Sequence, residues 1–182
     1  LLFPGTPGAG KTTLAWVLAK NIDCDILYLN ATEERGMDDI REKVGKFAAS
    51  ASFKKIKIVI LDEATHLLAA SQVLLLNMIE TFALKTRFIL TGNYVERLIP
   101  ALKSRLQKFE LTTPDKAEIC EMATNILDAE KVKYDVKDVA FVINRFYPDQ
   151  REIINNLQAN TLKGKFTIDK NKVAARNAYL DQ

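Results

Sequence analysis

Cysteine is scarce in this chain of 182 residues, which contains only Cys24 and Cys120. The two lie far apart and form no Cys-x-x-Cys pair, so the sequence indicates neither a disulfide framework nor a zinc site. Glycine and proline are also few, with seven and five residues, and this excludes fibrous and low-complexity classes. A reducing compartment fits this composition best.

Long hydrophobic runs and targeting signals are absent as well. No apolar run approaches the roughly 18 residues that a membrane helix needs. No basic segment followed by an apolar stretch and a cleavage site opens the chain. We therefore expect a protein that is not secreted and has no membrane partner. The chain opens at Leu1 rather than Met and enters directly into a strand-like run, so we expect a fragment.

The remaining composition is typical of a folded domain. Apolar residues make up 48% and charged residues 27% of the chain, which excludes disorder, and the length suggests one or two domains. The net charge is +3, and the excess lies in residues 1–112. Within them, residues 35–57 hold seven basic and three acidic side chains. This cluster either draws a polyanion or is a solvated helix face.

Residues 1–112 alternate between short apolar runs and helical periodicity, which predicts an α/β domain. Each run is rich in Ile, Leu, Val or Phe and is bounded by polar or glycine residues. Five strands interleaved with helices predict a parallel sheet covered on both sides. The stretch 69–83 is apolar almost all round, so it should be buried or face a partner. The expected strands are Leu1–Phe3, Asp25–Leu29, Ile56–Leu61, Arg87–Leu90 and Lys108–Leu111.

Residues 113–182 show helical periodicity without a strand signal, which predicts a small all-α domain hinged near Pro114. We expect helices near 119–127 and over 136–143, a third capped by Asp149 with Glu152 and ended by Gly164, and a fourth over 168–180.

The strongest motif is the P-loop pattern Gly, four residues, Gly-Lys-Thr, which spans Gly5 to Thr12. It follows a strand and opens a helix, and this is the context that the motif requires. Backbone N–H groups of such a loop surround a phosphate, and the helix N-terminus adds partial positive charge. Lys11 would reach the β- and γ-phosphates, and the Thr12 hydroxyl would bind Mg²⁺. The expected nucleotide-binding residues are Pro7, Gly8, Ala9, Gly10, Lys11, Thr12 and Thr13.

Two carboxylates, Asp62 and Glu63, close the apolar run 58–61. Open α/β sheets bind ligands at this end of their strands. Asp62 can hold Mg²⁺ through water, and Glu63 can polarise an attacking water. Small-molecule kinases usually need no water-activating Glu there, so the pair favours hydrolysis.

Four further residues are candidates for the same site. Asn93 follows a strand and could orient the water, while Asn30 could hydrogen-bond Glu63 in an inactive arrangement. The alternative for both is an ordinary turn residue. Arg105 lies far along the chain and could reach a neighbour's γ-phosphate in trans. Arg151 lies in the first turn of a helix, where a cation opposes the macrodipole, so it points to an anion. For either arginine the alternative is a surface salt bridge.

With these residues in place, the chain resembles the AAA+ ATPases, and among them the sliding-clamp loaders: replication factor C small subunits and their T-even phage homologues. The segments that carry the resemblance, besides the P-loop and the acidic pair, are residues 27–36, 93–105 and 148–151. The resemblance spans nearly the whole chain, and residues 93–105 are its most specific part.

The resemblance implies a ring of five subunits that binds ATP with Mg²⁺ at subunit interfaces, opens a sliding clamp and places it on primer–template DNA. Hydrolysis then releases the clamp. The roles that it implies are the Walker motifs for Lys11, Thr12, Asp62 and Glu63, the first and second sensors for Asn93 and Arg151, the trans finger for Arg105, the switch on Glu63 for Asn30, and DNA-backbone contacts for Arg35, Arg41 and Lys46.

The chain departs from the family at Thr65, where members often have Asp, and at Leu76 and Asn77, where many carry an arginine pair. The family's adenine-holding N-terminal segment and C-terminal collar are missing from this stretch, so alone it should bind ATP weakly and form no ring. The expected location is the cytoplasm of a bacterial, archaeal or phage-infected cell, or a eukaryotic nucleus. The alternatives are another AAA+ machine such as a branch-migration motor or initiator, a scaffold subunit without turnover, and a small-molecule kinase.

Overall fold

The computed structural model describes residues 1–168, and the chain divides into two compact units, Leu1–Thr112 and Thr113–Gln182. No helix in the described part is long and apolar enough to cross a membrane. The first unit contains, in chain order, β1 (Leu2–Pro4), α1 (Lys11–Lys20), β2 (Cys24–Asn30), α2 (Met37–Asp39), the π-helical turn η1 (Ile40–Gly45), α3 (Lys46–Ala49), β3 (Ile56–Asp62), the 3₁₀ turn η2 (Ala64–His66), α4 (Ala69–Thr81), β4 (Thr86–Gly92), the 3₁₀ turn η3 (Val95–Arg97) and α5 (Pro100–Arg105).

The first unit is built on a parallel sheet with the strand order β1-β4-β3-β2. The predicted α/β fold is confirmed, but the predicted fifth strand is not continuous. The segment 108–111 makes only isolated parallel bridges to β1, at Leu2 and Gly5. Pro4 explains the break: Leu2 N donates to Gln107 O at 2.9 Å, and the next donor along β1 would be the nitrogen of Pro4, which carries no hydrogen.

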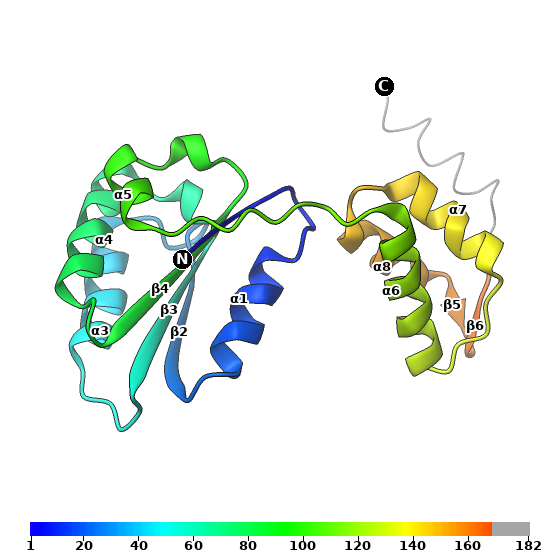
Figure 1. Ribbon diagram of the computed structural model, residues 1–182, viewed down its shortest axis with the longest axis horizontal. Coiled ribbons are helices and arrows are strands. Elements are labelled where there is room, and N and C mark those ends of the chain that lie inside the picture. Colours follow the sequence, from blue (N-terminus) through cyan, green and yellow to red (C-terminus); the bar gives the residue numbers. More distant parts are fainter. Residues whose placement is uncertain (169–182) are drawn as a thin grey trace. The chain divides into compact units, whose positions relative to one another are not determined.

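Helices cover both faces of this sheet, as a parallel sheet requires. Helix α1 lies on one face, and α3, α4 and α5 lie on the other (Figure 1). The buried residues form two clusters accordingly, one that includes Ala15 and Ile60 and one that includes Leu61 and Leu75. Helix α4 is buried on one side only, because Leu75 is fully buried whereas Val73 is 50% exposed.

The expected helix after β2 is formed by α2, η1 and α3 in succession. Its apolar stripe buries Ile40 and Val44 completely. Lys57 on β3 is 3% exposed, and its ammonium group donates to the carbonyls of Phe47, at 2.6 Å, and Ser50 near the end of α3. A lysine that caps carbonyls in this way is a structural residue, so Lys57 does not belong to the basic surface cluster.

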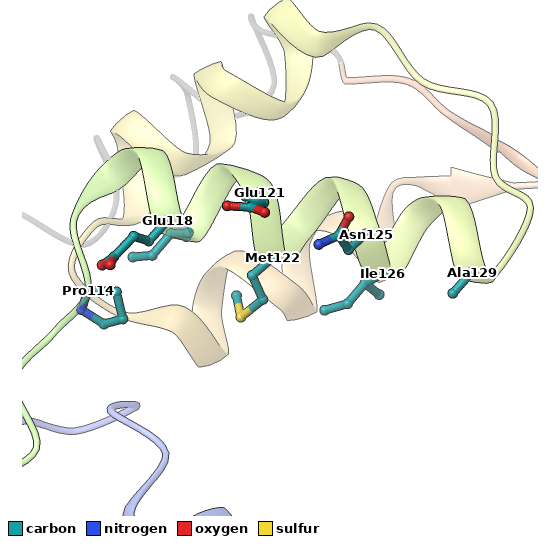
Figure 2. A pocket seen from close by; sticks show the side chains of 8 residues that line it. Pro114, Glu118, Glu121, Met122, Asn125, Ile126 and Ala129 are labelled. Atoms are coloured by element: carbon teal, nitrogen blue, oxygen red, sulfur yellow. The ribbon is translucent and has the colours of Figure 1, made fainter.

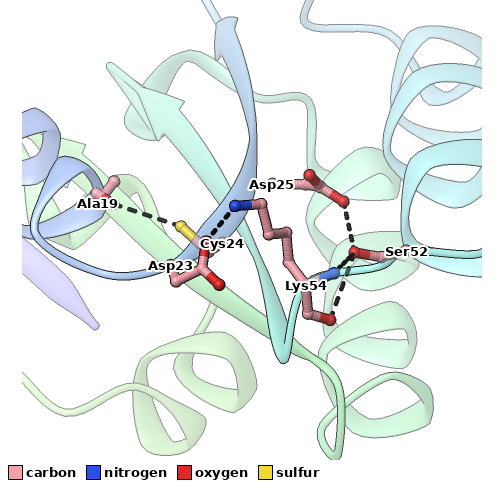
Figure 3. Close-up of polar contacts among 6 residues, drawn as sticks. All are labelled: Ala19, Asp23, Cys24, Asp25, Ser52 and Lys54. Atoms are coloured by element: carbon pink, nitrogen blue, oxygen red, sulfur yellow. Dashed lines mark hydrogen bonds and ion pairs between the residues drawn. The ribbon is translucent and has the colours of Figure 1, made fainter.

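Polar contacts at the opposite edge of the sheet from the strand carboxyl ends join β2 to the segment before β3 (Figure 3). Ser52 Oγ donates to Asp25 Oδ2 at 2.5 Å and accepts from Lys54 N at 2.9 Å. Lys54 also forms an ion pair with Asp23. These contacts hold the edge strand β2 in register with β3.

The second unit contains α6 (Lys116–Ala129), α7 (Val136–Phe146), α8 (Gln150–Ala159) and a hairpin of β5 (Thr161–Leu162) and β6 (Lys165–Phe166). The all-α prediction is therefore wrong in one respect, because a hairpin follows α8. Helix α8 ends at Ala159 rather than at Gly164. Gly164 instead takes φ 73° in the turn of the hairpin, a conformation that glycine adopts without strain. All but the first residue of the expected helix 168–180 lies outside the described residues.

One face of α6 carries an open hollow of about 600 Å³ (Figure 2). Its lining is mainly apolar and includes Ile119, Met122 and Ile126, and its polar lining residues include Glu118 and Glu121. The hollow contains none of the candidate site residues, and we assign no ligand to it.

Candidate functional site

The glycine-rich loop leads from β1 into α1 as the motif requires. Gly10 takes φ 84°, which L side chains rarely adopt, and α1 begins at the next residue. Ala9 N donates to Thr6 O at 3.3 Å and closes the turn between them. Pro7 is exposed and Gly8 partly exposed. The loop and the first turn of α1 thus form a concave backbone of the kind that binds phosphate.

Lys11 lies at the centre of this loop and is only 6% exposed. Its Nζ donates to Thr6 O at 2.8 Å, to Gly5 O at 3.2 Å and to Asn93 Oδ1 at 2.6 Å. A buried ammonium group is expensive unless oxygens surround it, and these three acceptors supply that. Phosphate oxygens are stronger acceptors for the same group.

The Asp62 carboxylate lies at the carboxyl end of β3 and accepts three hydroxyl hydrogen bonds. Thr12 donates to Oδ1 at 2.7 Å and Thr91 donates to Oδ1 at 2.5 Å. Tyr28 donates to Oδ2 at 3.0 Å. The donors come from α1, β4 and β2, so three elements determine the orientation of one carboxylate.

The Tyr28 phenol is a stable donor in this group. Burial, and then its hydrogen bond to Asp62, raise the pKa of Tyr28 to about 12, so the phenol keeps its proton at neutral pH. Its ring stacks on Trp16 of α1 with the ring centroids 5.4 Å apart.

Glu63 follows Asp62 with φ 51°, in the left-handed region. Such a conformation is strained for a residue with a side chain and persists only where neighbours hold it. Glu63 N donates to Thr91 Oγ1 at 3.1 Å. Asn93 Nδ2 lies 3.3 Å from each carboxylate oxygen of Glu63. Asn93 therefore accepts from Lys11 and donates to Glu63, which is the orientation of its amide that both charges favour.

Thr12 and Asp62 fit a magnesium ion held mainly by phosphate and water. Both supply the oxygen ligands that Mg²⁺ prefers, and Thr12 Oγ1 and Asp62 Oδ1 already lie 2.7 Å apart. Among residues 1–168 no group of three or more His, Cys, Asp or Glu could hold a metal alone. A P-loop site needs no such group, because substrate phosphates complete the coordination.

Gly92 allows β4 to approach η2 closely just before Asn93. A Cβ at this position would lie 2.5 Å from Thr65 Cγ2, and Thr65 is 4% exposed. We expect Gly92→Ala to destabilise the protein by about 1–3 kcal/mol, because the overpacked side chain must displace its neighbour. Urea unfolding measures this loss.

Thr65→Ser provides the control for Gly92→Ala, because it removes the methyl group that the new Cβ meets. In the double variant the loss should be smaller than the sum of the two single losses by at least about 0.5 kcal/mol. Strictly additive losses would show that Gly92 is required for another reason.

The Asn30 amide oxygen is bonded within its own turn, and no hydrogen bond between Asn30 and Glu63 is seen among the described residues. Its Oδ1 accepts from Thr32 N at 3.0 Å and from Thr32 Oγ1 at 2.8 Å. Asparagine at a strand end readily closes such an Asx turn. Asn30 lies opposite Asp62 in the β2–β3 register, close to the site, and its role as a switch stays a prediction.

Arg105 lies away from the loop of its own chain. It ends α5, and the segment after it pairs with β1 from Leu2 onward, so Arg105 lies near the edge where the strands begin. The P-loop follows the opposite end of β1. The Arg105 guanidinium forms an exposed ion pair with Glu80 Oε1 at 2.7 Å. Such pairs contribute little to stability, so Arg105 can exchange this partner for another anion.

Arg151 lies in the second unit, exposed in the first turn of α8. The Asp149 half of the predicted capping box is present, because Asp149 Oδ1 accepts from the backbone N of both Arg151 and Glu152. The return bond from Glu152 is not formed, since Asp149 N donates to Phe146 O at 2.9 Å. The assignment of Arg151 as the second sensor rests on the resemblance.

The basic residues predicted to contact DNA lie around the helix formed by α2, η1 and α3. Arg41 pairs with Asp38 at 3.4 Å and Lys46 with Glu42 at 2.6 Å, all four being exposed. Arg35 precedes the helix, and its carbonyl accepts from Ser71 Oγ at 2.8 Å. Exposed pairs exchange readily, so the two ion pairs reduce the local positive charge without blocking a phosphate.

Tyr28 and Thr91 are the residues that sequence reasoning missed. A weak signal existed for both: Thr91 lies two residues before Asn93, and Tyr28 two residues before Asn30. Side chains alternate along a strand, so the side chain of Tyr28 lies on the same side of β2 as that of Asn30. Thr91 has the same spacing from Asn93, which directly follows β4.

Comparisons with known proteins identify the family of this chain. The model of the ATPase family associated with various cellular activities (AAA) matches residues 1–113. The replication factor C small subunit of Sulfurisphaera tokodaii is 38% identical over 176 residues, which cover 93% of this chain and 54% of that protein. Replication factor C small subunit 1 of Pyrobaculum islandicum is 39% identical, over 99% of this chain and 56% of that protein. The predicted resemblance is thereby confirmed.

Solved structures of RuvB variants from Thermotoga maritima share the fold. One has a TM-score of 0.74 at 21% identity and covers 87% of this chain and 53% of its own. The chain spans about half the length of the curated relatives that it matches. On the match to residues 1–113, the chain belongs to the AAA family of ATPases.

Proposed function

We propose that this chain is the ATP-hydrolysing part of a sliding-clamp loader subunit, which couples nucleotide turnover to opening a clamp and loading it on primer–template DNA. The catalytic part of the proposal rests on one set of hydrogen bonds. Lys11 donates to Asn93 and Asn93 donates to Glu63, while Thr12 donates to Asp62 beside them. The replication factor C small subunits among its relatives support the assignment to a clamp loader.

Each residue of this chain of contacts has a separate task. Lys11 and the loop amides bind the β- and γ-phosphates. Thr12 and Asp62 hold Mg²⁺, which neutralises charge on the phosphates when it is bound. Glu63 accepts a proton from the attacking water, and Asn93 keeps the Glu63 carboxylate directed toward the loop. Asn93 also connects the base to the lysine, so both groups are positioned by one amide.

The remaining assignments concern other molecules. Arg105 would serve the neighbouring subunit in a ring of five, the number that the family implies, because it lies near the edge where the strands begin, away from its own loop. Arg151 would approach the nucleotide from the helical unit. Arg35, Arg41 and Lys46 would contact the DNA backbone, where each phosphate contact releases counterions.

The test is the steady-state ATPase rate of rings assembled with the partner subunits. We expect a sliding clamp and primed DNA to raise the rate together by more than either does alone. Phosphate should be released free and not be transferred to an acceptor. Stimulation by branched or unprimed duplex DNA without a clamp would instead identify another AAA machine, and the absence of turnover would identify a scaffold subunit.

A further inference from the structure

The two oxygens of the Asp62 carboxylate have different partners. Oδ1 accepts from Thr12, which belongs to the P-loop helix α1, and from Thr91, which belongs to the neighbouring strand β4. Oδ2 accepts from the phenol of Tyr28, at 3.0 Å. Tyr28 belongs to β2, the strand at the sheet edge, so this second oxygen depends on an element outside the P-loop and both sensor motifs.

The Tyr28 ring also contacts the P-loop helix α1, through Trp16. It stacks on Trp16 with an interplanar angle of 27° and centroids 5.4 Å apart, and Lys20 Nζ lies 5.6 Å from the centre of the Trp16 ring. Trp16 follows Thr12 by four residues on α1, so both side chains lie on one helix face. Offset aromatic pairs of this kind restrict ring motion, and the phenol oxygen is therefore held near Asp62.

We propose that Tyr28 is a positioning residue for Asp62 that fixes the carboxylate through Oδ2 for binding the hydrated magnesium ion. This inference rests on the proposed function. If the Thr12 hydroxyl bound magnesium in place of Asp62, Thr91 would still donate to Oδ1 and Tyr28 to Oδ2. One donor would then remain on each oxygen, and the plane of the carboxylate could not rotate freely.

The expected consequence concerns magnesium and not the nucleotide alone. Groups that orient a metal-binding residue usually change metal affinity by about ten- to hundredfold when removed. Because Thr91 still holds Oδ1, we expect Tyr28→Phe to raise the magnesium concentration for half-maximal effect by roughly three- to tenfold. Phenylalanine keeps the ring and its stack on Trp16, so the fold should be unaffected.

The experiment titrates Mg²⁺ into the purified protein in the presence of a fluorescent ADP analogue and follows the increase in the affinity of the protein for the analogue. The affinity of the analogue in EDTA is measured separately. Trp16 is the one tryptophan of the chain, so its emission reports whether the stack on Tyr28 persists. Tyr134→Phe is the matched control, because the Tyr134 hydroxyl also bonds a carboxylate, that of Asp128 in the second unit.

A higher magnesium requirement in Tyr28→Phe alone, with unchanged affinity in EDTA and unchanged Trp16 emission, supports the proposal. An unchanged magnesium requirement overturns it. An equal loss of affinity in EDTA overturns it too, since Tyr28 would then support the nucleotide site or the fold in general. If the wild-type protein binds no nucleotide, the proposed function fails. If the wild type binds with magnesium and Tyr28→Phe matches it, only the role of Tyr28 fails.

Discussion

Glu63→Gln is expected to slow ATP hydrolysis by about two to four decades while leaving ATP affinity nearly unchanged. The amide cannot accept a proton from water, but it has the shape of the carboxylate and keeps an oxygen for the Asn93 amide, now 3.3 Å away. The backbone of Glu63 is held by Thr91, so the strained conformation should persist. Phosphate release in a single turnover measures the loss, and equilibrium binding of ATP measures the affinity.

Glu130→Gln is the matched control for this substitution, because Glu130 is an exposed residue that follows α6 in the second unit. It should hydrolyse ATP at the wild-type rate. If Glu63→Gln also retains the wild-type rate, Glu63 is not the base. If it loses ATP binding to the same extent as turnover, its role is structural.

Arg105→Ala is expected to reduce hydrolysis at the neighbouring subunit's site by roughly 10³–10⁵-fold, the usual contribution of an arginine finger. Its own subunit should bind ATP with unchanged affinity, because Arg105 lies at the edge of the sheet away from its own P-loop. Rings that mix wild-type and Arg105→Ala subunits separate the two effects. A second ring pairs an Arg105→Ala subunit with a Glu63→Gln neighbour. There, the only active sites combine Glu63 of the Arg105→Ala subunit with Arg105 of the Glu63→Gln subunit.

Glu80→Gln tests the alternative that Arg105 matters only for its ion pair with Glu80. The amide removes the charge that Arg105 contacts, and exposed pairs contribute at most about 1 kcal/mol, so this variant should hydrolyse ATP almost normally. Equal defects in Glu80→Gln and Arg105→Ala would contradict the trans role. So would isolated monomers that hydrolyse ATP as fast as rings.

The P-loop and the acidic pair could be predicted from the sequence because each motif consists of residues that are close together in the chain. The P-loop follows one strand, and the acidic pair ends another. Lys11 and Thr12 must follow the loop glycines, and Asp62 and Glu63 must end a buried strand. The structure places both motifs at the carboxyl edge of one sheet, with Thr12 and Asp62 in contact. Parallel strands end at the same edge of a sheet, and this made the meeting predictable although β4 lies between β1 and β3.

The details that the sequence could not provide depend on hydrogen bonds between distant elements. Asn30 Oδ1 accepts a hydrogen bond from Thr32 N, two residues away, and this local turn orients the amide in a way that the sequence alone does not reveal. Tyr28 reaches Asp62 across the β2–β3 pair, and its place two residues before Asn30 is only a weak signal of that contact. Gly164 was compatible with a helix end and with a hairpin turn, and the burial of Phe166 in the core of the second unit, where it is 1% exposed, favoured the hairpin.

The most direct test of the account is the equilibrium binding of ATP with magnesium to the wild-type protein and to Lys11→Ala. We expect the wild-type protein to bind and Lys11→Ala to bind about ten- to hundredfold more weakly, because the charged contacts to phosphate are lost. Lys85→Ala, a substitution of an exposed lysine before β4, should bind as wild type does. Equal affinity in wild type and Lys11→Ala would contradict the claim that the loop from Gly5 to Thr12 holds the triphosphate.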